Sequence, residues 1–367
     1  MNKKEGNYKN KNSLLGTMLV FFTVVKYYSN RMFEGTPIPV AKICMIITGA
    51  LALFLIVNNI KKYNVYHLAM FGLLCVQFIF TRSTSLIYVY ILALALLNLE
   101  MKEIMKTYII TSLILFIVFL VLNILNIMPT KYVHNRNDFG FGNPNGAYIS
   151  FFVIYVAYMY LKFDKFEKKD LVLLVVFPLM VYMETETRTG FLTVVGAFVL
   201  TMILQRVDIN KKHIKIVFAS VPILISGMSV YIAYMHRNSI FWNKLLSHRP
   251  LYWYKYLANE EYGLRLMGYN DNIRDIVFRP RVPLDSGYIL TLYTAGIVVF
   301  IVLMLLYAYA IYKLCSENKK AEVMLILSVL VYAFAESMLL DLGTNITFVF
   351  IAYALSKLGD RKKYNMR

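Results

Sequence analysis

Arginine is distributed unevenly along this chain. Long apolar runs divide the chain into segments. Every second segment between them belongs to a set that holds ten arginines and only 5 lysines, whereas the other set holds 21 lysines and 3 arginines. Together they account for the 39 basic residues. A guanidinium group is a planar fork that binds phosphate or carboxylate through two parallel hydrogen bonds, and lysine alone is sufficient to orient a chain in a membrane. The pattern therefore predicts an anion-binding face, although these arginines would also suit simple contact with lipid headgroups. They are Arg31, Arg82, Arg136, Arg188, Arg237, Arg249, Arg265, Arg274, Arg279 and Arg281.

Carboxylates occur among these arginines and are the candidates for acid–base chemistry. Glu186 and Arg188 share the stretch "ETETRTGF" at the end of an apolar run, where Glu186 either pairs with Arg188 or contacts a sugar. Asp285 directly precedes another apolar run and suits a helix cap as well as a base. Glu336 lies well within the eleventh apolar run, where a charge is costly and therefore a functional candidate, with a structural Glu–Arg pair as the alternative.

The segment 134–148, "HNRNDFGFGNPNGAY", is polar and rich in turn residues between two apolar runs. Its three glycines permit tight turns and close approach of the backbone, and Pro144 is tolerated in the first turn of a helix. Asn143, Asn145 and Arg136 offer hydrogen bonds to sugar hydroxyls or phosphate. We expect a re-entrant or surface loop that lines a polar cavity, and the alternative is a turn without a ligand.

One connection, residues 236–284, is much longer than the others, and loops of this length are usually functional or disordered. Its stretch "SIFWNKLLSHRPLYWYKYLAN" places aromatic and apolar residues at about helical spacing, with Lys244, Arg249 and Lys255 between them. We predict that this loop carries short helices, and that this stretch forms a short amphipathic helix at the outer membrane–water boundary. Either it is only an aromatic anchor, or Arg249 also extends toward an anionic headgroup.

The elements that position these residues are predicted to be membrane-spanning helices. The chain has 367 residues, is 59% hydrophobic and has a mean hydropathy of +0.57. Apolar runs of roughly 18 residues or more recur along it, which predicts an all-α polytopic transmembrane bundle. We expect residues 1–367 to form a single membrane-embedded domain of about twelve spans. The spans are predicted at 14–30, 39–57, 65–81, 84–99, 107–127, 144–161, 170–183, 189–205, 214–235, 286–312, 321–340 and 345–356.

The loop charges predict the orientation of these spans. An even number of spans places both termini on one side, and with the termini inside, the inner segments hold 24 of the 39 Lys and Arg residues. Eight of the other 15 lie in the long extracytoplasmic loop 236–284. Because the positive-inside rule counts short loops, both termini are predicted to be cytoplasmic. Within 170–205 the stretch "METETRTG" is either a sharp turn or a polar break inside the membrane.

Several classes of function find no support in the sequence. The net charge of +18 lies mostly in short loops between spans, so it does not indicate a nucleic-acid partner. The three cysteines have no metal-ligand spacing, and no HExxH, GxSxG or DxD motif occurs. We therefore expect no metal, no cofactor and no nucleic acid. The head 1–12 shows no signal-peptide cleavage site, which makes the first span a signal anchor.

Four segments, taken in order, resemble those of Wzy-type polysaccharide polymerases. "FGFGNPNGAY" (139–148) resembles the GNPN-type segment, and "ETRTGFLTVV" (186–195) resembles the "SRTGxL" segment. "LLSHRPLYW" (245–253) is similar to the outer-loop "SGRxxxW" pattern, with His248 where glycine is usual. "PLDSGYILTLYTAGIVVF" (283–300) is similar to "DNSYLxLLxxxGIxG". The resemblance covers roughly residues 130–345, and the order of the four segments is more specific than any one of them.

This resemblance implies a fold, an activity and partners. The O-antigen polymerase and ligase superfamily acts on undecaprenyl-diphosphate-linked glycans at the outer face of the bacterial plasma membrane. A GT-C-like, metal-independent glycosyltransferase that inverts the anomeric carbon is therefore expected, working on surface polysaccharide such as capsule or exopolysaccharide. The implied partners are the lipid-linked oligosaccharide, membrane lipid, a chain-length regulator and a flippase.

We assign three catalytic residues: Arg249 and Arg188 hold the diphosphate, and Asp285 activates the acceptor hydroxyl. Glu336 or Glu186 would replace Asp285 if it is not the base. The candidates for substrate binding are Arg136, Asn143, Asn145, Glu186, His248, Arg281 and Glu336.

Two other functions stay open. A ligase would move the finished glycan to another acceptor, but that branch usually has histidine at the position of Asp285, which favours the polymerase. A non-enzymatic flippase is the third possibility. Transporters more often show internal repeats, and we find none in this sequence.

Overall fold

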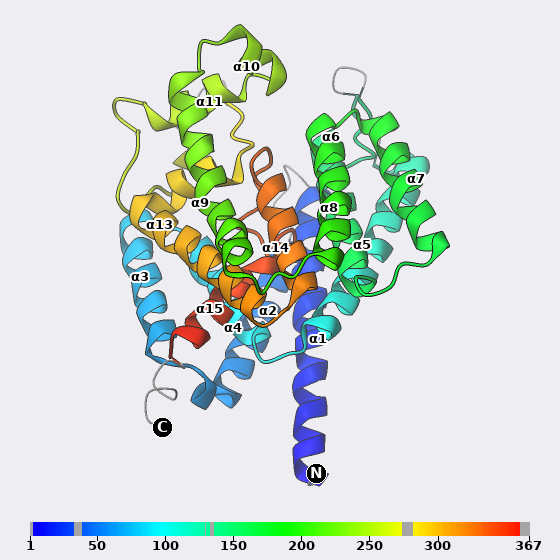
Figure 1. The fold of residues 1–367 in the computed structure, drawn as a ribbon, viewed down its shortest axis with the longest axis vertical. Coiled ribbons are helices and arrows are strands. Elements are labelled where there is room, and N and C mark those ends of the chain that lie inside the picture. The colour runs from blue at the N-terminus through cyan, green and yellow to red at the C-terminus, as the bar shows by residue number, and fades with distance from the viewer. Residues whose placement is uncertain (1–2, 33–38, 129, 133–135, 274–281, 360–367) are drawn as a thin grey trace.

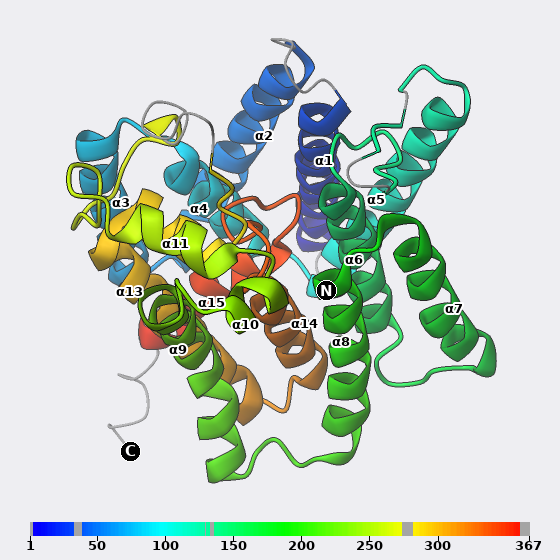
Figure 2. The same ribbon diagram turned by 90° about the horizontal axis from the view of Figure 1, so that it is seen from above.

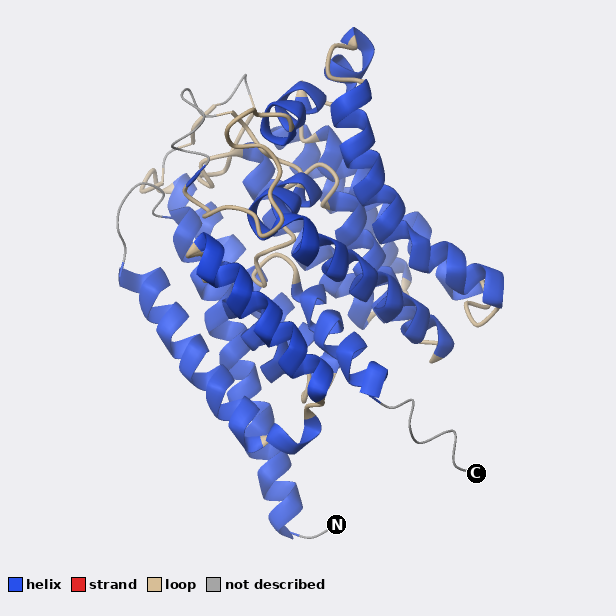
Figure 3. Cartoon of the chain, turned by 90° about the vertical axis from the view of Figure 1, so that its left-hand side faces the viewer, coloured by secondary structure: helices blue, strands red, loops and turns tan. Residues whose placement is uncertain are grey.

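The computed structural model describes residues 3–32, 39–128, 130–132, 136–273 and 282–359. All regular secondary structure in these ranges is helical, so the predicted all-α class is confirmed. The helices form one bundle, with α10 and α11 at the end opposite the first turns of α1 (Figure 1). The longest loops gather at the same end as α10 and α11 (Figure 3). We call it the loop end.

Each of the twelve predicted apolar runs overlaps one helix of the bundle. Short 3-10 turns, η1 (Ile60–Lys62) and η2 (Ile346–Phe348), lie beside α3 and α15. The twelve helices are α1 (Lys3–Met32), α2 (Pro39–Asn58), α3 (Val65–Thr81), α4 (Ser85–Leu96), α5 (Met101–Ile124), α6 (Pro144–Leu161), α7 (Lys168–Thr185), α8 (Arg188–Arg206), α9 (Lys212–Met235), α13 (Gly287–Ser316), α14 (Lys320–Tyr332) and α15 (Val349–Gly359).

Five of these helices are long and apolar enough, by length and composition, to cross a membrane within the described ranges: α2, α5, α8, α9 and α13. Three shorter apolar segments, 65–81, 85–96 and 346–358, fall below that length. The structure therefore supports a membrane protein, and the count of twelve spans stays a prediction.

The division between α7 and α8 is a sharp turn and not a polar break within a helix. Glu186 adopts a left-handed backbone with φ 46°, and its N–H donates to the Tyr182 carbonyl at 2.7 Å. The two helices then run side by side, with the rings of Tyr182 and Phe191 stacked at 4.8 Å. The turn places Glu186 and Arg188 together at the loop end.

Helix α13 is broken at Gly296, where the long connection 236–284 contacts it. Gly296 has φ 83° and ψ 167°, so the helical hydrogen bonds cannot continue through it. The N–H groups of Ile297 and Val298 donate instead to the carbonyls of Arg265 and Leu266, both at 3.1 Å. The connection therefore satisfies the backbone groups that the break releases, and both segments hold each other in place.

This contact requires glycine on both sides. A Cβ at Gly268 would lie 2.2 Å from the Thr294 carbonyl oxygen, and one at Gly296 would lie 2.4 Å from the Gly268 nitrogen. We expect Gly268→Ala and Gly296→Ala each to destabilise the protein by about 3 kcal/mol or more, from backbone strain and overpacking, measured by thermal unfolding in detergent. Gly196→Ala and Gly227→Ala are the controls, because a Cβ there meets nothing within 4 Å. These controls should be neutral or stabilising by up to about 1 kcal/mol, and equal behaviour of all four variants would contradict this account.

The long connection carries short helices, as predicted, but the aromatic stretch expected to form a single amphipathic helix forms two. They are α10 (Ile240–Leu245) and α11 (Arg249–Leu257), separated by left-handed backbone at Ser247 and His248, with φ 52° and 62°. Neither residue is glycine, and the local signal of a new helix is Pro250 in the first turn of α11. Helix α10 exposes its apolar side chains, whereas α11 buries Trp253 and crosses the bundle over α13 and beside α9 (Figure 2).

Candidate functional site

The candidate site is centred on Arg249, the first residue of α11. Its guanidinium is buried, and Nη2 donates to Oε1 of Glu336 at 3.2 Å while lying 3.7 Å from Oδ2 of Asp285. The Glu336 side chain is 4% exposed and that of Asp285 is 40% exposed. One guanidinium thus contacts both a buried and an accessible carboxyl group. The three residues come from segments far apart in the sequence.

Glu336 does not lie inside a helical span, contrary to the prediction. Helix α14 ends at Tyr332, and Glu336 belongs to the irregular segment 333–345 that precedes η2. The Gly287 N–H donates to the Ala333 carbonyl at 2.8 Å, which ties this segment to the start of α13. On the other side the Trp253 ring packs edge-on against Phe334 at 5.4 Å. These two contacts bring Asp285, Arg249 and Glu336 together.

The environment of Glu336 makes its ionised form costly. Glu336 lies outside the helices that are long enough to span a membrane. The pKa of its carboxyl group is therefore set by the protein groups around it. Burial raises the pKa of this carboxyl group to about 8, and the guanidinium of Arg249 acts in the opposite direction. Asp285 raises the pKa further, whereas Arg136 and Arg31 lower it. The Glu336 carboxyl group therefore interacts electrostatically with three guanidinium groups.

Arg136 is the second arginine of the site, and its side chain is held from two sides. Nε donates to the Thr185 carbonyl at 2.7 Å, and Nη2 donates to Oδ1 of Asn145 at 2.7 Å and to Oγ1 of Thr187 at 3.0 Å. The loop before α6 is thereby joined to the α7–α8 turn. Burial lowers the pKa of Arg136, while Glu336 and Glu186 raise it. Asn145 thus orients Arg136.

Asn143 has a structural contact, and it forms no hydrogen bond with an arginine in the described ranges. It is the N-cap of α6, and its side chain accepts the Asn145 N–H at 2.8 Å while remaining exposed. Farther back in the same loop, the buried Asp138 carboxylate accepts the N–H groups of Lys131 and Gly140 at 2.9 and 3.0 Å. Both side chains therefore shape the loop that carries Arg136. Asp138 was not among the predicted site residues.

Arg188 and Glu186 lie on the accessible side of the site, at the α7–α8 turn. Both side chains are exposed, and neither forms an ion pair with another residue in the part of the chain that the structure describes. They are close enough to Arg136 to shift its pKa, Glu186 upward and Arg188 downward. The turn therefore adds one cation and one carboxylate at the rim of the site.

Arg31 belongs to the site although it was not among the predicted site residues. It lies at the end of α1, with its guanidinium 5.6 Å from the centre of the Tyr27 ring, and it influences Glu336. A Cβ placed on Gly146 would lie 3.4 Å from Nη1 of Arg31, so glycine in "NPNG" leaves room for this side chain. The available signal was the position of Arg31 among the ten arginines at loop positions. We call Arg31, Arg136, Arg188 and Arg249 the arginine cluster.

The other arginines of the predicted anion-binding face are engaged elsewhere or are not described. Arg237 and Arg265 lie 4.1 and 4.5 Å from the ring centres of Tyr254 and Tyr269, and Arg82 ends α3 with φ 58°. The two ring contacts are structural, and Arg82 acts through its backbone as the C-cap of α3. Arg281, which was predicted to bind substrate, lies outside the described residues together with Arg274 and Arg279.

His248 has a backbone role next to Arg249. It is the N-cap residue of α11 with φ 62°, and its exposed ring lies 6.4 Å from the ring centre of Tyr252. A left-handed backbone favours glycine. The turn before α11 therefore forms with a residue other than glycine in this conformation.

We expect His248→Gly to be neutral or to stabilise the protein by up to about 1 kcal/mol, because glycine adopts this backbone without a steric penalty. His248→Val should destabilise it by about 2 kcal/mol, since a β-branched residue is strongly disfavoured at positive φ. Thermal unfolding of the two purified variants distinguishes them. Equal unfolding temperatures would show that the turn rearranges.

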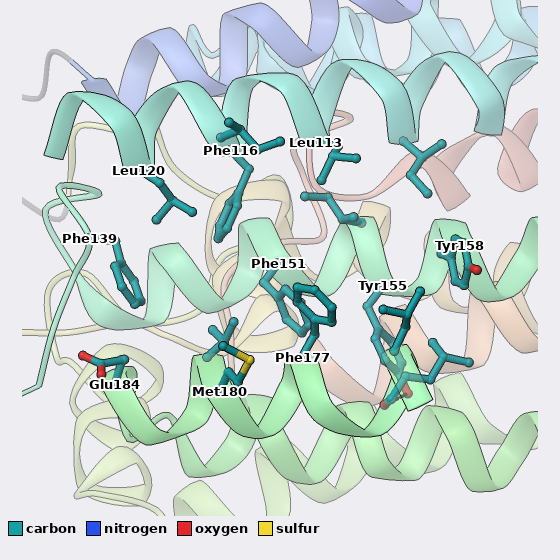
Figure 4. A pocket seen from close by; sticks show the side chains of 16 residues that line it. Leu113, Phe116, Leu120, Phe139, Phe151, Tyr155, Tyr158, Phe177, Met180 and Glu184 are labelled. Carbon is teal, nitrogen blue, oxygen red and sulfur yellow. Dashed lines mark hydrogen bonds between the residues drawn. The ribbon is translucent and has the colours of Figure 1, made fainter. Parts of the chain in front are cut away.

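An apolar groove begins beside the arginine cluster. Its volume is about 720 Å³, and it lies between α5, α6 and α7 (Figure 4). Glu184 and Phe139 line its end nearest the site, where the Asn137 N–H donates to the Glu184 carbonyl at 2.9 Å. The rest of its lining is hydrocarbon and aromatic, including Leu113, Phe116, Leu120, Phe151, Phe177 and Met180.

Comparisons with known proteins leave the family of this chain open. No protein-family model, characterised protein or solved structure matches it. Within the described residues, no group of three or more His, Cys, Asp or Glu side chains is arranged to hold a metal ion. The groups that the described site offers for chemistry are its arginine and carboxyl side chains.

Proposed function

We propose that this protein joins undecaprenyl-diphosphate-linked oligosaccharide repeat units into a surface polysaccharide at the outer face of the bacterial plasma membrane. The supporting observation is that all four segments with a family resemblance contribute to one site. They supply Asn145, Arg188, Arg249 and Asp285 in turn. Asn145 and Asp285 are 140 positions apart in the sequence. The four segments nevertheless contribute to one cluster of charged groups that suits a diphosphate.

The arginine cluster supplies the charge that the leaving group requires. Its four guanidinium groups face three carboxyl groups, those of Glu186, Asp285 and Glu336, and burial favours the neutral form of Glu336. The site therefore has excess positive charge. In the proposed reaction, negative charge develops on the diphosphate as the anomeric C–O bond breaks, and preorganised guanidinium groups stabilise it.

We assign the base to Asp285 because its carboxylate is accessible and that of Glu336 is buried. The acceptor hydroxyl oxygen attacks the anomeric carbon on the face opposite the diphosphate. The new C–O bond forms as the old one breaks, Asp285 accepts the hydroxyl proton, and undecaprenyl diphosphate leaves. Glu336 positions the Arg249 fork in this scheme.

The groove beside the cluster suits the hydrocarbon chain of the donor. Its lining extends over 109–120 of α5 and 173–184 of α7, which corresponds to about 16 Å along each helix. Leu113, Phe177 and Met180 are 45%, 49% and 57% exposed, so a chain can enter sideways from the bilayer. A diphosphate at the cluster would then lie at the end of the groove.

We expect Leu113→Trp, which fills the groove, to raise the KM for an undecaprenyl-linked donor about tenfold. Losing the burial of about two methylene groups costs roughly 1.5 kcal/mol. A donor on a single isoprene unit should show little change, because its chain ends near the mouth of the groove and does not reach Leu113. Leu192→Trp is the control, since Leu192 is an exposed leucine of α8 outside the groove. An unchanged KM for the long-chain donor would show that the hydrocarbon chain of the donor does not bind in the groove.

The function itself is tested by deleting the gene and sizing lipid-linked glycans by mass spectrometry. Single repeat units that accumulate on the lipid and are accessible from outside support the polymerase. Long chains that accumulate on the lipid would instead identify a ligase. Single units retained on the inner leaflet would identify a flippase, and the site assignments would then lose their basis.

A further inference from the structure

A second cavity lies at the opposite end of the bundle from the arginine cluster. Its volume is about 850 Å³. It is formed where α6 and α8 end and where α14 begins, whereas the other ends of α6 and α8 carry Asn145 and Arg188. It therefore shares no residue with the proposed catalytic site. Its position and its charged lining make this cavity a candidate for a second ligand-binding site.

Lysine dominates the charged lining of this cavity. Lys102, Lys165, Lys319 and Lys320 line it, against two carboxylates, those of Asp164 and Glu322. These lysines reach it from three separate parts of the chain: the start of α5, the α6–α7 connection and the α13–α14 turn. Such convergence in space is not required for membrane orientation, which needs only lysines on the correct side.

Two of the four ammonium groups are uncommitted. Lys319 pairs with Glu317 at 2.8 Å, and Nζ of Lys320 donates to the Gln205 carbonyl at 3.3 Å. The side chains of Lys102 and Lys165 form no hydrogen bond or ion pair with the rest of the described chain, and both are exposed. They can therefore bind an anion without breaking an existing contact.

The two carboxylates do not cancel the positive charge of the four lysines. Apolar side chains form part of the cavity wall behind these charged groups. Glu322 accepts a hydrogen bond from the Tyr160 hydroxyl at 3.1 Å, so it is partly engaged. Tyr160 and Phe163 are buried in the wall, and Phe166 and Met202 add partly buried apolar surface. The cavity thus offers ammonium groups at its mouth and apolar surface behind them, a combination that fits a phosphate attached to an organic group.

We propose that this cavity binds a phosphate-bearing ligand through Lys102 and Lys165. Lysine binds phosphate as a compact point charge, and basic pockets between membrane helices hold anionic headgroups. The ligand is either the headgroup of an anionic phospholipid or a soluble phosphate ester, which share this chemistry. The site does not depend on the polymerase proposal.

The test uses the purified full-length protein and measures its unfolding temperature together with its retained ligands by native mass spectrometry. Phosphatidylglycerol is compared with phosphatidylcholine, and glycerol 3-phosphate is added separately without lipid. We expect phosphatidylglycerol or glycerol 3-phosphate to bind and raise the unfolding temperature, because a ligand that binds only the folded state stabilises it. Stabilisation by phosphatidylglycerol alone identifies the headgroup as the source, and stabilisation by glycerol 3-phosphate identifies the soluble ester.

Variants show whether binding takes place in this cavity. The double variant Lys102→Gln/Lys165→Gln should bind the probe roughly 30-fold more weakly, from about fivefold per lysine. Lys168→Gln/Lys211→Gln is the matched control, since it removes two charges at the same end but outside the cavity. Equal loss in both double variants, or no preference for the two phosphate-bearing probes over phosphatidylcholine in the wild type, would overturn the proposal.

Discussion

Arg249→Lys should reduce the rate of chain growth about 10²- to 10³-fold while the protein still folds. Lysine keeps a positive charge near Glu336 but loses the fork that binds a diphosphate through two hydrogen bonds. Removing one preorganised donor from a developing oxyanion has an effect of this size. The measurement is the initial rate with purified lipid-linked repeat units, together with the unfolding temperature of each variant.

The lysine variant is more informative than alanine at this position. Arg249→Ala leaves the buried Glu336 without its 3.2 Å hydrogen-bond partner, and an unsatisfied buried polar group costs about 1–3 kcal/mol. Loss of activity in the alanine variant would therefore be mixed with loss of folded protein. Arg237→Lys is the control, because Arg237 lies in the same connection but stacks on Tyr254, 4.1 Å from its ring centre. Full activity of Arg249→Lys would remove Arg249 from the site.

Asp285→Asn is expected to lower the rate about 10²- to 10⁴-fold with little effect on donor binding. Asparagine has the same shape and still places an oxygen near Arg249, but it cannot accept the proton of the acceptor hydroxyl. Kinetics with saturating donor separate the two effects, since a lost base lowers kcat and leaves donor affinity unchanged.

Two further variants test whether this effect belongs to Asp285. Asp271→Asn is the control, because Asp271 lies in the same connection and accepts hydrogen bonds only from Ser83 and Ser85, at 2.8 and 2.6 Å, in the part of the chain that the structure describes. It should retain activity. Glu336→Gln should raise the KM for the donor more than it lowers kcat, since Glu336 positions Arg249. An active Asp285→Asn with an inactive Glu336→Gln would transfer the base to Glu336.

Local sequence determined the helices well but not the breaks between them. Apolar runs identify each helix because a segment surrounded by lipid or by the protein interior must hydrogen-bond its own backbone groups. A helix does this within one segment. The break at Ser247 and His248 lies at residues that rarely adopt left-handed backbone, and its only local signal is Pro250 in the first turn of α11. The end of α14 at Tyr332 was missed. The apolar pattern continues beyond it, while the backbone leaves the helix to meet Gly287 and Trp253.

The sequence by itself determined the kinds of group in the candidate site: arginines in one set of loops, a few carboxylates, and turn residues around Asn143 and Asn145. Only the tertiary structure decided which of them meet. It adds Arg31 to the arginine cluster and leaves Arg237 and Arg265 stacked on tyrosines. It also distinguishes the buried Glu336 from the accessible Asp285. These outcomes depend on how helices pack against one another, and packing is decided by long-range side-chain contacts that hydrophobic periodicity within one helix does not specify.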